Sequence, residues 1–160
     1  MPPCMDVYIW LPKCDAGELS RFIESYVDRE RPGDDRLATF IRAYIEGAAS
    51  DDDRAALAEL GRGDTPDDGF SLYLEARVHY AAIITITREG SAVLGLSIDD
   101  PDDSPETPAL ARALIGRLRA DFRSPAGRAG FELAPAHSRE EWENDGLVQI
   151  REGELPRETL

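Results

Sequence analysis

The sequence predicts an α+β fold in which helices pack mainly on one face of an antiparallel sheet. Three segments within residues 70–98 alternate apolar residues at the period of a β-strand, while segments on either side of them repeat apolar residues at helical spacing. A chain of 160 residues also buries roughly 70% of the surface that it exposes when unfolded. We therefore expect one domain over residues 1–160 with a core at about 5–150, and flexible ends at 1–4 and 152–160.

Residues 70–98 predict a three-stranded meander. The turns are expected at residues 77–79 and at Arg88-Glu89-Gly90, where glycine permits a positive φ. Each strand has one strongly apolar face, and the residues on these faces are Phe70, Leu72, Leu74, Ala82, Ile84, Ile86, Leu94, Leu96 and Ile98. The meander is thus expected to be the surface on which the helices pack.

The segments before the meander predict one strand and three helices. Residues 5–11 are apolar on both faces and stop at Pro12, which favours a central strand. Asp15 and Glu18 form a typical helix start, followed by a helix to residue 28. The apolar stripe of that helix repeats from Leu37 in a second helix, and Ser50 opens a third that ends near residue 60.

The segments after the meander predict a fourth helix and a short β-containing end. An acidic loop over residues 99–106 leads into a helix that Thr107 is expected to cap and that runs from Pro108 to about residue 122. Residues 130–133 and 146–150 are strand candidates, and Ser138 with Glu141 predicts a short capped helix that holds Trp142. The resulting β-α-α-α-β-β-β-α-β order predicts a variant of the ferredoxin-like arrangement.

The charge balance limits the partners of the protein. A formal net charge of −14 repels nucleic-acid phosphates and anionic membranes, and it attracts basic proteins at long range. Cys4 and Cys14 are too far apart on an extended strand for a disulfide, and no apolar run has membrane-spanning length, which favours a cytoplasmic protein. Because Lys13 is the single lysine and Ala, Gly and Asp are frequent, the composition is typical of a GC-rich bacterial genome.

The motifs favour a binding protein over an enzyme. No nucleophile signature, dinucleotide fingerprint or P-loop is present, and His79 and His137 are the only histidines. Two Cys and two His without pair spacing do not form a zinc motif, and the prolines in the acidic loop interrupt any calcium-loop pattern. We therefore expect no catalytic residue, no metal and no cofactor.

The leading hypothesis is a small acidic protein of the immunity or antitoxin type that inhibits a basic, nuclease-like bacterial toxin. Its partner would be a basic protein, and the charge would chiefly raise the association rate. The expected contact residues are the acids of two loops, Asp99, Asp100, Asp102, Asp103 and Glu106 first, and Asp64, Asp67 and Asp68 second.

Two alternatives remain from the sequence. A small enzyme or ligand-binding module would use a groove between sheet and helices, lined by Tyr73, Arg77, His79 and Tyr80. A homo-oligomer, such as a dimer, would use the outer face of the sheet, which includes Tyr73, Ile83, Thr85 and Val93, if no helix covers it. The two acidic loops are expected at opposite ends of the meander. We therefore expect each loop to form a site on its own rather than one site together.

Overall fold

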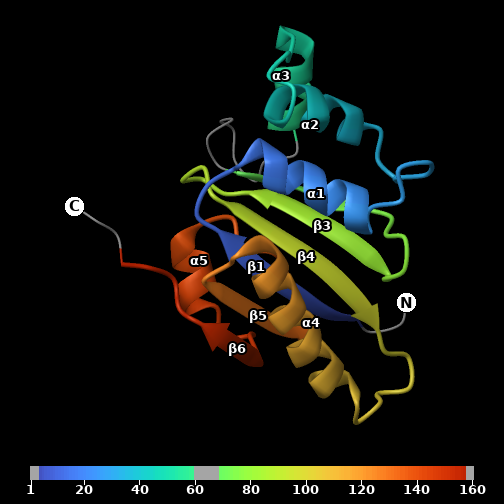
Figure 1. Ribbon diagram of the computed structural model, residues 1–160, viewed down its shortest axis with the longest axis vertical. Coiled ribbons are helices and arrows are strands. Elements are labelled where there is room, and N and C mark those ends of the chain that lie inside the picture. The colour runs from blue at the N-terminus through green and yellow to red at the C-terminus, as the bar shows by residue number, and fades with distance from the viewer. Residues whose placement is uncertain (1–3, 60–68, 158–160) are drawn as a thin grey trace.

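The computed structural model describes residues 4–59 and 69–157, which form a six-stranded antiparallel sheet with five helices. The strands lie in the order β2-β3-β4-β1-β5-β6 (Figure 1). The elements in chain order are β1 Cys4–Leu11, α1 Ala16–Tyr26, α2 Arg36–Tyr44, α3 Asp51–Ala58, β2 Phe70–Leu74, β3 Ala81–Ile86, β4 Ala92–Asp99, α4 Thr107–Phe122, β5 Ala126–Phe131, α5 Arg139–Asn144 and β6 Ile150–Gly153. The predicted α+β class is confirmed.

The predicted meander and central strand are also confirmed. Strands β2, β3 and β4 are consecutive antiparallel neighbours, and Gly90 occupies the β3–β4 turn with a φ of 85°. Strand β1 lies between β4 and β5 and runs antiparallel to both, so α4 connects two parallel strands across it. The four inner strands β3-β4-β1-β5 therefore have the ferredoxin-like order, to which β2 and β6 are added as edges.

The main core lies between the sheet and helices α1 and α4, which cover the same face (Figure 1). Alternation along β1 places Val7 and Ile9 on this face, where they meet the apolar faces of the meander. Helix α1 contributes its predicted stripe, and Phe22 packs against Phe122 of α4 with ring centroids 6.0 Å apart. The apolar residues predicted to face the helices thus do so.

Helices α2 and α3 form a hairpin at the β2 edge (Figure 1). The Phe40 ring of α2 packs edge-on against Phe70, with centroids 6.3 Å apart. Ser50 and Asp53 form a complete capping box at the start of α3, and Asp53 also accepts two hydrogen bonds from Arg42 at 2.7 and 2.9 Å. The acids at this helix start therefore have a structural role, as their position predicts.

The second face of the sheet is partly covered by the chain after β5. Tyr8 and Trp10 point to this face and pack with Leu133 and Trp142 in a second, smaller core. The Trp10 and Trp142 rings meet edge-on at 5.5 Å. Ile83, Val93 and Thr85 are buried here, so the outer face expected to support self-association is not free, and of its predicted residues only Tyr73 is exposed.

Arg128 holds this covering segment against β5. Its side chain is only 1% exposed and donates to the carbonyls of Ala134, Glu141 and Trp142 at 3.2–3.4 Å. The guanidinium also lies 4.8 Å from the centroid of the Trp142 ring. Burial lowers the pKa of Arg128 to about 10, which leaves the group charged at neutral pH.

Several predicted boundaries are shifted. Strand β5 begins at Ala126 instead of residue 130, because two glycines and Arg128 obscure its alternation. Strand β6 lies at Ile150–Gly153 instead of 146–150, so residues 152–153 are paired and not loose. Cys4 was expected in a flexible end, but it pairs with Asp99 and is buried within β1. Within the described residues, Cys4 and Cys14 form no disulfide.

Candidate functional site

The predicted acidic loop connects β4 to α4 and exposes most of its carboxylates. Asp99, Asp102, Asp103 and Glu106 are exposed. Asp100 differs from the expectation, because it is 3% exposed and shapes the loop: its carboxylate accepts the Ser104 amide at 2.8 Å. Four of the five predicted contact residues in this loop are therefore accessible, and the fifth is a structural residue.

The exposed acids of this loop lack the arginine partners that some acids elsewhere have. Asp34, Asp53, Glu143 and Glu152 each lie within 4 Å of an arginine. Within residues 4–59 and 69–157, no Arg or Lys comes that close to the four exposed carboxylates of the β4–α4 loop. Their negative charge is thus available to a partner.

The second predicted acidic set, Asp64, Asp67 and Asp68, lies outside the described residues. The pairing of strands β2, β3 and β4 shows which residues lie at each end of the meander. Phe70 at the start of β2 pairs with Ile86, which pairs with Ala92 at the start of β4. Phe70 and Asp99 therefore lie at opposite ends of the meander.

A hollow of about 320 Å³ opens on the second face of the sheet, at the same end as the β4–α4 loop. Its floor includes Asp6 and Tyr8 of β1, and Glu132 lies on its wall. Tyr73 and Tyr80, two of the residues predicted to line a ligand groove, also line it and are 58% and 45% exposed. The hollow thus combines carboxylates with accessible aromatic rings.

Asp6 is the buried acid of this hollow. It is 8% exposed, and the Ser97 hydroxyl donates a 2.5 Å hydrogen bond to its Oδ1. Burial raises the pKa of Asp6 to about 6, and the nearby charge of Glu132 adds to the effect, while the Ser97 hydrogen bond opposes it. The carboxylate is therefore mainly ionised at pH 7 and becomes neutral in mildly acidic solution.

The hollow and the acidic loop are joined through Cys4. Cys4 pairs with Asp99 across the β1–β4 ladder, and its amide donates to Glu132 Oε1 at 2.8 Å. Burial raises the pKa of the Cys4 thiol, and the charges of Asp6, Glu132 and Asp99 raise it further. These three carboxylates come from β1, β4 and the segment after β5, and all of them lie close enough to Cys4 to raise the pKa of its thiol. We refer to the hollow with the exposed acids of the β4–α4 loop as the acidic end.

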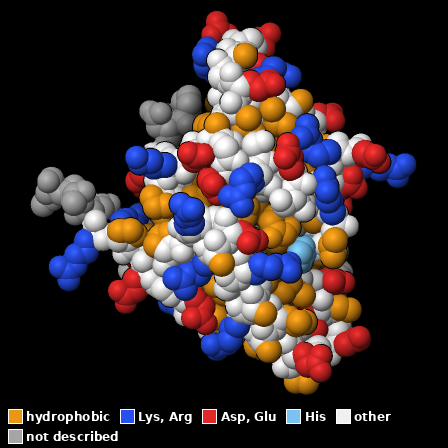
Figure 2. Space-filling model, in the orientation of Figure 1, with side chains coloured by type: hydrophobic (Ala, Val, Ile, Leu, Met, Phe, Trp, Pro, Cys, Tyr) orange, Lys and Arg blue, Asp and Glu red, His pale blue; other side chains and the backbone are white. Residues whose placement is uncertain are grey.

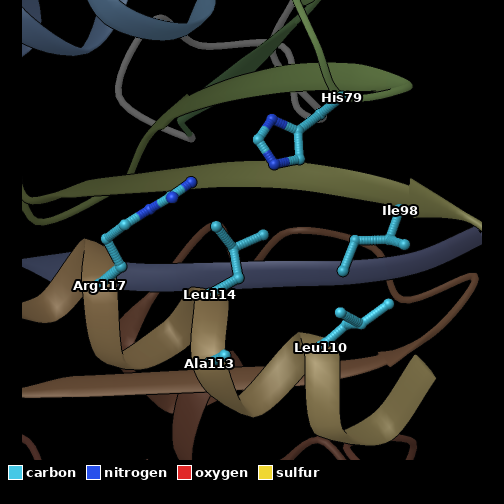
Figure 3. A pocket seen from close by; sticks show the side chains of 6 residues that line it. All are labelled: His79, Ile98, Leu110, Ala113, Leu114 and Arg117. Carbon is cyan, nitrogen blue, oxygen red and sulfur yellow. The ribbon is translucent and has the colours of Figure 1, made fainter. Parts of the chain in front are cut away.

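A second hollow, of about 450 Å³, lies on the helix-covered face between α4 and the β2–β3 connection. His79 and Arg117 are its polar lining residues, and their side chains approach from opposite sides over Leu114 and Ile98 (Figure 3). Figure 2 shows this side of the molecule, where hydrophobic side chains border a histidine. The four predicted groove residues therefore do not form one groove, since His79 lies in this hollow while Tyr73 and Tyr80 line the other.

Arg77, the fourth predicted groove residue, lines neither hollow. Its amide donates to the Tyr26 carbonyl at 3.0 Å and its Nε to the Val27 carbonyl at 3.2 Å. Arg77 thus binds the β2–β3 connection to the end of α1. The single groove expected from the sequence is wrong because residues 73–80 project to both sides of the sheet.

A buried polar cluster on the second face also escaped the sequence analysis. Ser71 Oγ lies 2.7 Å from His137 Nε2 and 2.7 Å from Thr85 Oγ1. A serine next to a histidine is the start of a nucleophilic site, but all three side chains are at most 8% exposed and none lines a described hollow. The cluster instead joins β2 and β3 to the covering segment.

Within the described ranges, no three His, Cys, Asp or Glu residues come together as metal ligands, and no helix is long and apolar enough to span a membrane. Comparisons with protein-family models, curated proteins and solved structures found no match. The function must therefore be argued from the geometry and charge of the acidic end and the two hollows.

Proposed function

We propose that the protein binds a basic protein partner at the acidic end, as an inhibitor of the immunity or antitoxin type. The main supporting observation is that exposed carboxylates without a cation within 4 Å lie at the same end of the sheet as a hollow that contains a buried carboxylate and accessible tyrosines. This region offers a partner more than a negative net charge, because it combines exposed carboxylates with a hollow that can take one side chain of the partner.

The hollow fits an arginine or lysine side chain of the partner. Asp6 and Glu132 would accept charge-assisted hydrogen bonds from its cationic group. Tyr73 and Tyr80 would flank the aliphatic stem and the cation with their ring faces. A guanidinium suits this set better than an ammonium, since its planar fork binds carboxylates in pairs and stacks on aromatic rings.

The exposed acids of the β4–α4 loop would act as the rim of the contact. Charges at a rim raise the association rate and exclude partners of the same sign, more than they add affinity. The net charge of −14 extends this attraction beyond the contact surface. A nuclease-like bacterial toxin fits as the partner class, because an active site that binds phosphates is basic and is blocked by a complementary acidic surface.

The proposal is tested with acetylated hexa-arginine amide as a basic probe, by isothermal titration calorimetry at 50 and 300 mM NaCl. We expect binding that weakens steeply with salt. Two variants test the acidic end: D6N/E132Q changes the hollow, and D99N/D102N/D103N/E106Q changes the rim. Each should weaken binding about tenfold, which corresponds to about 1.4 kcal/mol.

The matched control for the rim is a variant with the same charge change outside the acidic end. The exposed acids Glu24, Glu30, Glu46 and Glu59 lie on or near α1 to α3, and E24Q/E30Q/E46Q/E59Q removes four charges there. Its affinity should change about twofold or less, because the residual effect is long-range and screened. Equal losses in the rim variant and in this control would show diffuse attraction and contradict a site at the acidic end.

A further inference from the structure

The hollow of about 450 Å³ on the helix-covered face is a second candidate site with the opposite charge. Its lining is apolar apart from two residues, His79 of the β2–β3 connection and Arg117 of α4 (Figure 3). Leu110 is also part of this lining and is 54% exposed. The volume lies in the range of small-molecule sites, and so does the combination of an apolar wall with few polar groups.

Arg117 has a different environment from the other α4 arginines. Arg112 pairs with Glu152 at 3.6 Å, and Arg119 donates to the carbonyls of Ser124 and Pro125. Within the part of the chain that the structure describes, no carboxylate lies within 4 Å of Arg117. In a chain with 32 acidic residues and 18 basic ones, a guanidinium without a close acid next to an apolar hollow is a ready anion partner.

Tyr26 lies beside the two polar lining residues of the hollow, Arg117 and His79. The Tyr26 hydroxyl interacts with Arg117 and donates to Asp121 Oδ2 at 3.5 Å. The His79 ring meets the Tyr26 ring edge-on at 6.1 Å. Burial and the positive charge of Arg117 lower the pKa of His79, so its imidazole is neutral at pH 7 and offers a hydrogen bond without a second charge.

We propose that this hollow binds a small amphipathic monocarboxylate, with its aliphatic chain on Ile98, Leu110 and Leu114 and its carboxylate on Arg117. A single guanidinium matches a single negative charge and binds a carboxylate through two parallel hydrogen bonds. A dianionic phosphate fits less well, because the hollow has one cation and the protein repels multiple charges. The apolar chain supplies the remaining affinity by burial.

The probe is sodium octanoate, titrated into ¹⁵N-labelled protein at pH 7 and followed by amide chemical shifts. We expect the shifts to cluster at residues 78–80, 98 and 110–117. Octan-1-ol keeps the chain without the charge and acetate keeps the charge without the chain, so each should bind at least about tenfold more weakly than octanoate. Equal binding of octanoate and octan-1-ol would overturn the role of Arg117.

Two variants locate the site and one serves as a control. R117Q should weaken octanoate binding about tenfold, because a charged hydrogen-bond partner is lost. L110S changes an exposed residue, so it should retain the fold and weaken binding by removing apolar contact. R123Q makes the same charge change at the exposed end of α4, outside the hollow, and should bind octanoate as the unaltered protein does.

The result that would overturn the proposal is unchanged octanoate affinity in both R117Q and L110S, or shifts that cluster on the second face of the sheet. The test is independent of the hollow that contains Asp6 and Glu132, since D6N/E132Q should bind octanoate normally. Failure of the hexa-arginine experiment would therefore leave this inference intact, and failure of the octanoate experiment would leave the acidic end intact.

Discussion

Asp6 of β1 and Ser97 of β4 face each other across the centre of the sheet, and the Ser97 hydroxyl donates to the Asp6 carboxylate at 2.5 Å. This bond stabilises the ionised form of the carboxylate, yet burial is the larger effect and raises the pKa of Asp6 to about 6. The acidic end thus contains a group that changes charge in mildly acidic solution.

The first prediction concerns the pH dependence of stability. The pKa of Asp6 is higher in the folded chain, at about 6, than the ordinary Asp value of about 3.9 in an unfolded chain. Between these values the folded state binds more protons, so the contribution of Asp6 to the free energy of unfolding falls as pH rises from 4 through 6. D6N removes this cost and should stabilise the protein at pH 7.5 by about 1–2 kcal/mol.

Urea unfolding of D6N and of the unaltered protein at pH 4.5, 6 and 7.5 measures this effect. The difference in unfolding free energy between the two should be smallest at pH 4.5 and should grow with pH. S97A removes the hydrogen bond but keeps the buried acid, so it should destabilise the protein at pH 7.5 and serves as the opposite control. A constant difference between D6N and the unaltered protein across this range would contradict the raised pKa.

The second prediction concerns Arg128, whose guanidinium joins β5 to the chain that covers the second face. R128K keeps the charge but lacks the planar fork that reaches three carbonyls, so it leaves buried acceptors unpaired. We expect a loss of about 2 kcal/mol in the free energy of unfolding. The matched control is R151K, because Arg151 also donates to the Trp142 carbonyl but is exposed, and we expect less than about 0.5 kcal/mol there.

Chemical unfolding followed by far-UV circular dichroism measures both variants, and tryptophan fluorescence adds a local signal. The protein has two tryptophans, and Trp10 and Trp142 both lie in the second core. R128K should therefore also expose tryptophan to quenchers under native conditions. Equal stability of R128K and R151K would contradict the proposed role of the fork.

The layout of the sheet was largely predictable because most of its signals are local. The alternation of residues 70–98 predicts three strands and their apolar faces, and short turns make consecutive strands neighbours. Helices α1 and α4 follow from apolar stripes and from start signals at Asp15 and Pro108, although α4 begins at Thr107 and has Glu106 at the cap position predicted for Thr107. In β5, by contrast, glycines and a buried arginine replace the alternating apolar residues, so its start was missed.

The candidate site was less predictable, because it depends on contacts between distant parts of the chain. The β4–α4 loop was visible as a run of acids, and Tyr73 and Tyr80 as aromatic residues near a turn. In the sequence, Asp6 is one polar residue of an otherwise apolar strand, and no motif or periodicity singles out Glu132. These two acids meet only because β1 pairs with both β4 and β5, and this strand order does not follow from periodicity.

The third prediction concerns the close contact of Tyr8 with Gly95, which face each other across the β1–β4 ladder. A Cβ atom at Gly95 would lie 2.5 Å from the Tyr8 ring, so the tyrosine beneath the acidic hollow packs directly on glycine. G95A must displace this ring and should cost about 2 kcal/mol of stability. G116A is the control, since nothing lies within 4 Å of the added methyl group. Because it removes a glycine from the middle of α4, it should stabilise the protein by about 0.5–1 kcal/mol.

Thermal and urea unfolding of the two glycine variants would show opposite signs. G95A should also weaken hexa-arginine binding, because the Tyr8 ring lies in the lining of the acidic hollow. G116A should leave that binding unchanged. A G95A variant as stable as the unaltered protein would show that the Tyr8 ring can move without cost, and would contradict the close packing.

The last prediction concerns the attachment of α3 to α2. Arg42 donates two hydrogen bonds to Asp53, and the Ser50 amide donates a third, so the pKa of this carboxyl is held well below its usual range. A lowered pKa in the folded state gives stability that is present above the unfolded value of about 3.9 and is lost as pH falls further. Acid should therefore loosen α3 before the central sheet, and hydrogen exchange of the α3 amides, corrected for intrinsic rates, measures this at pH 5 and pH 3.

D53N separates this effect from general acid unfolding. It removes the charge that Arg42 binds, so the α3 amides should exchange faster at pH 5 and should show a smaller further change at pH 3. D52N is the control in the same helical turn, because Asp52 is exposed and makes no ion pair within the described chain. If D52N and D53N changed α3 exchange equally, the favourable charge at the helix start would explain the result, and the Arg42 contact would not.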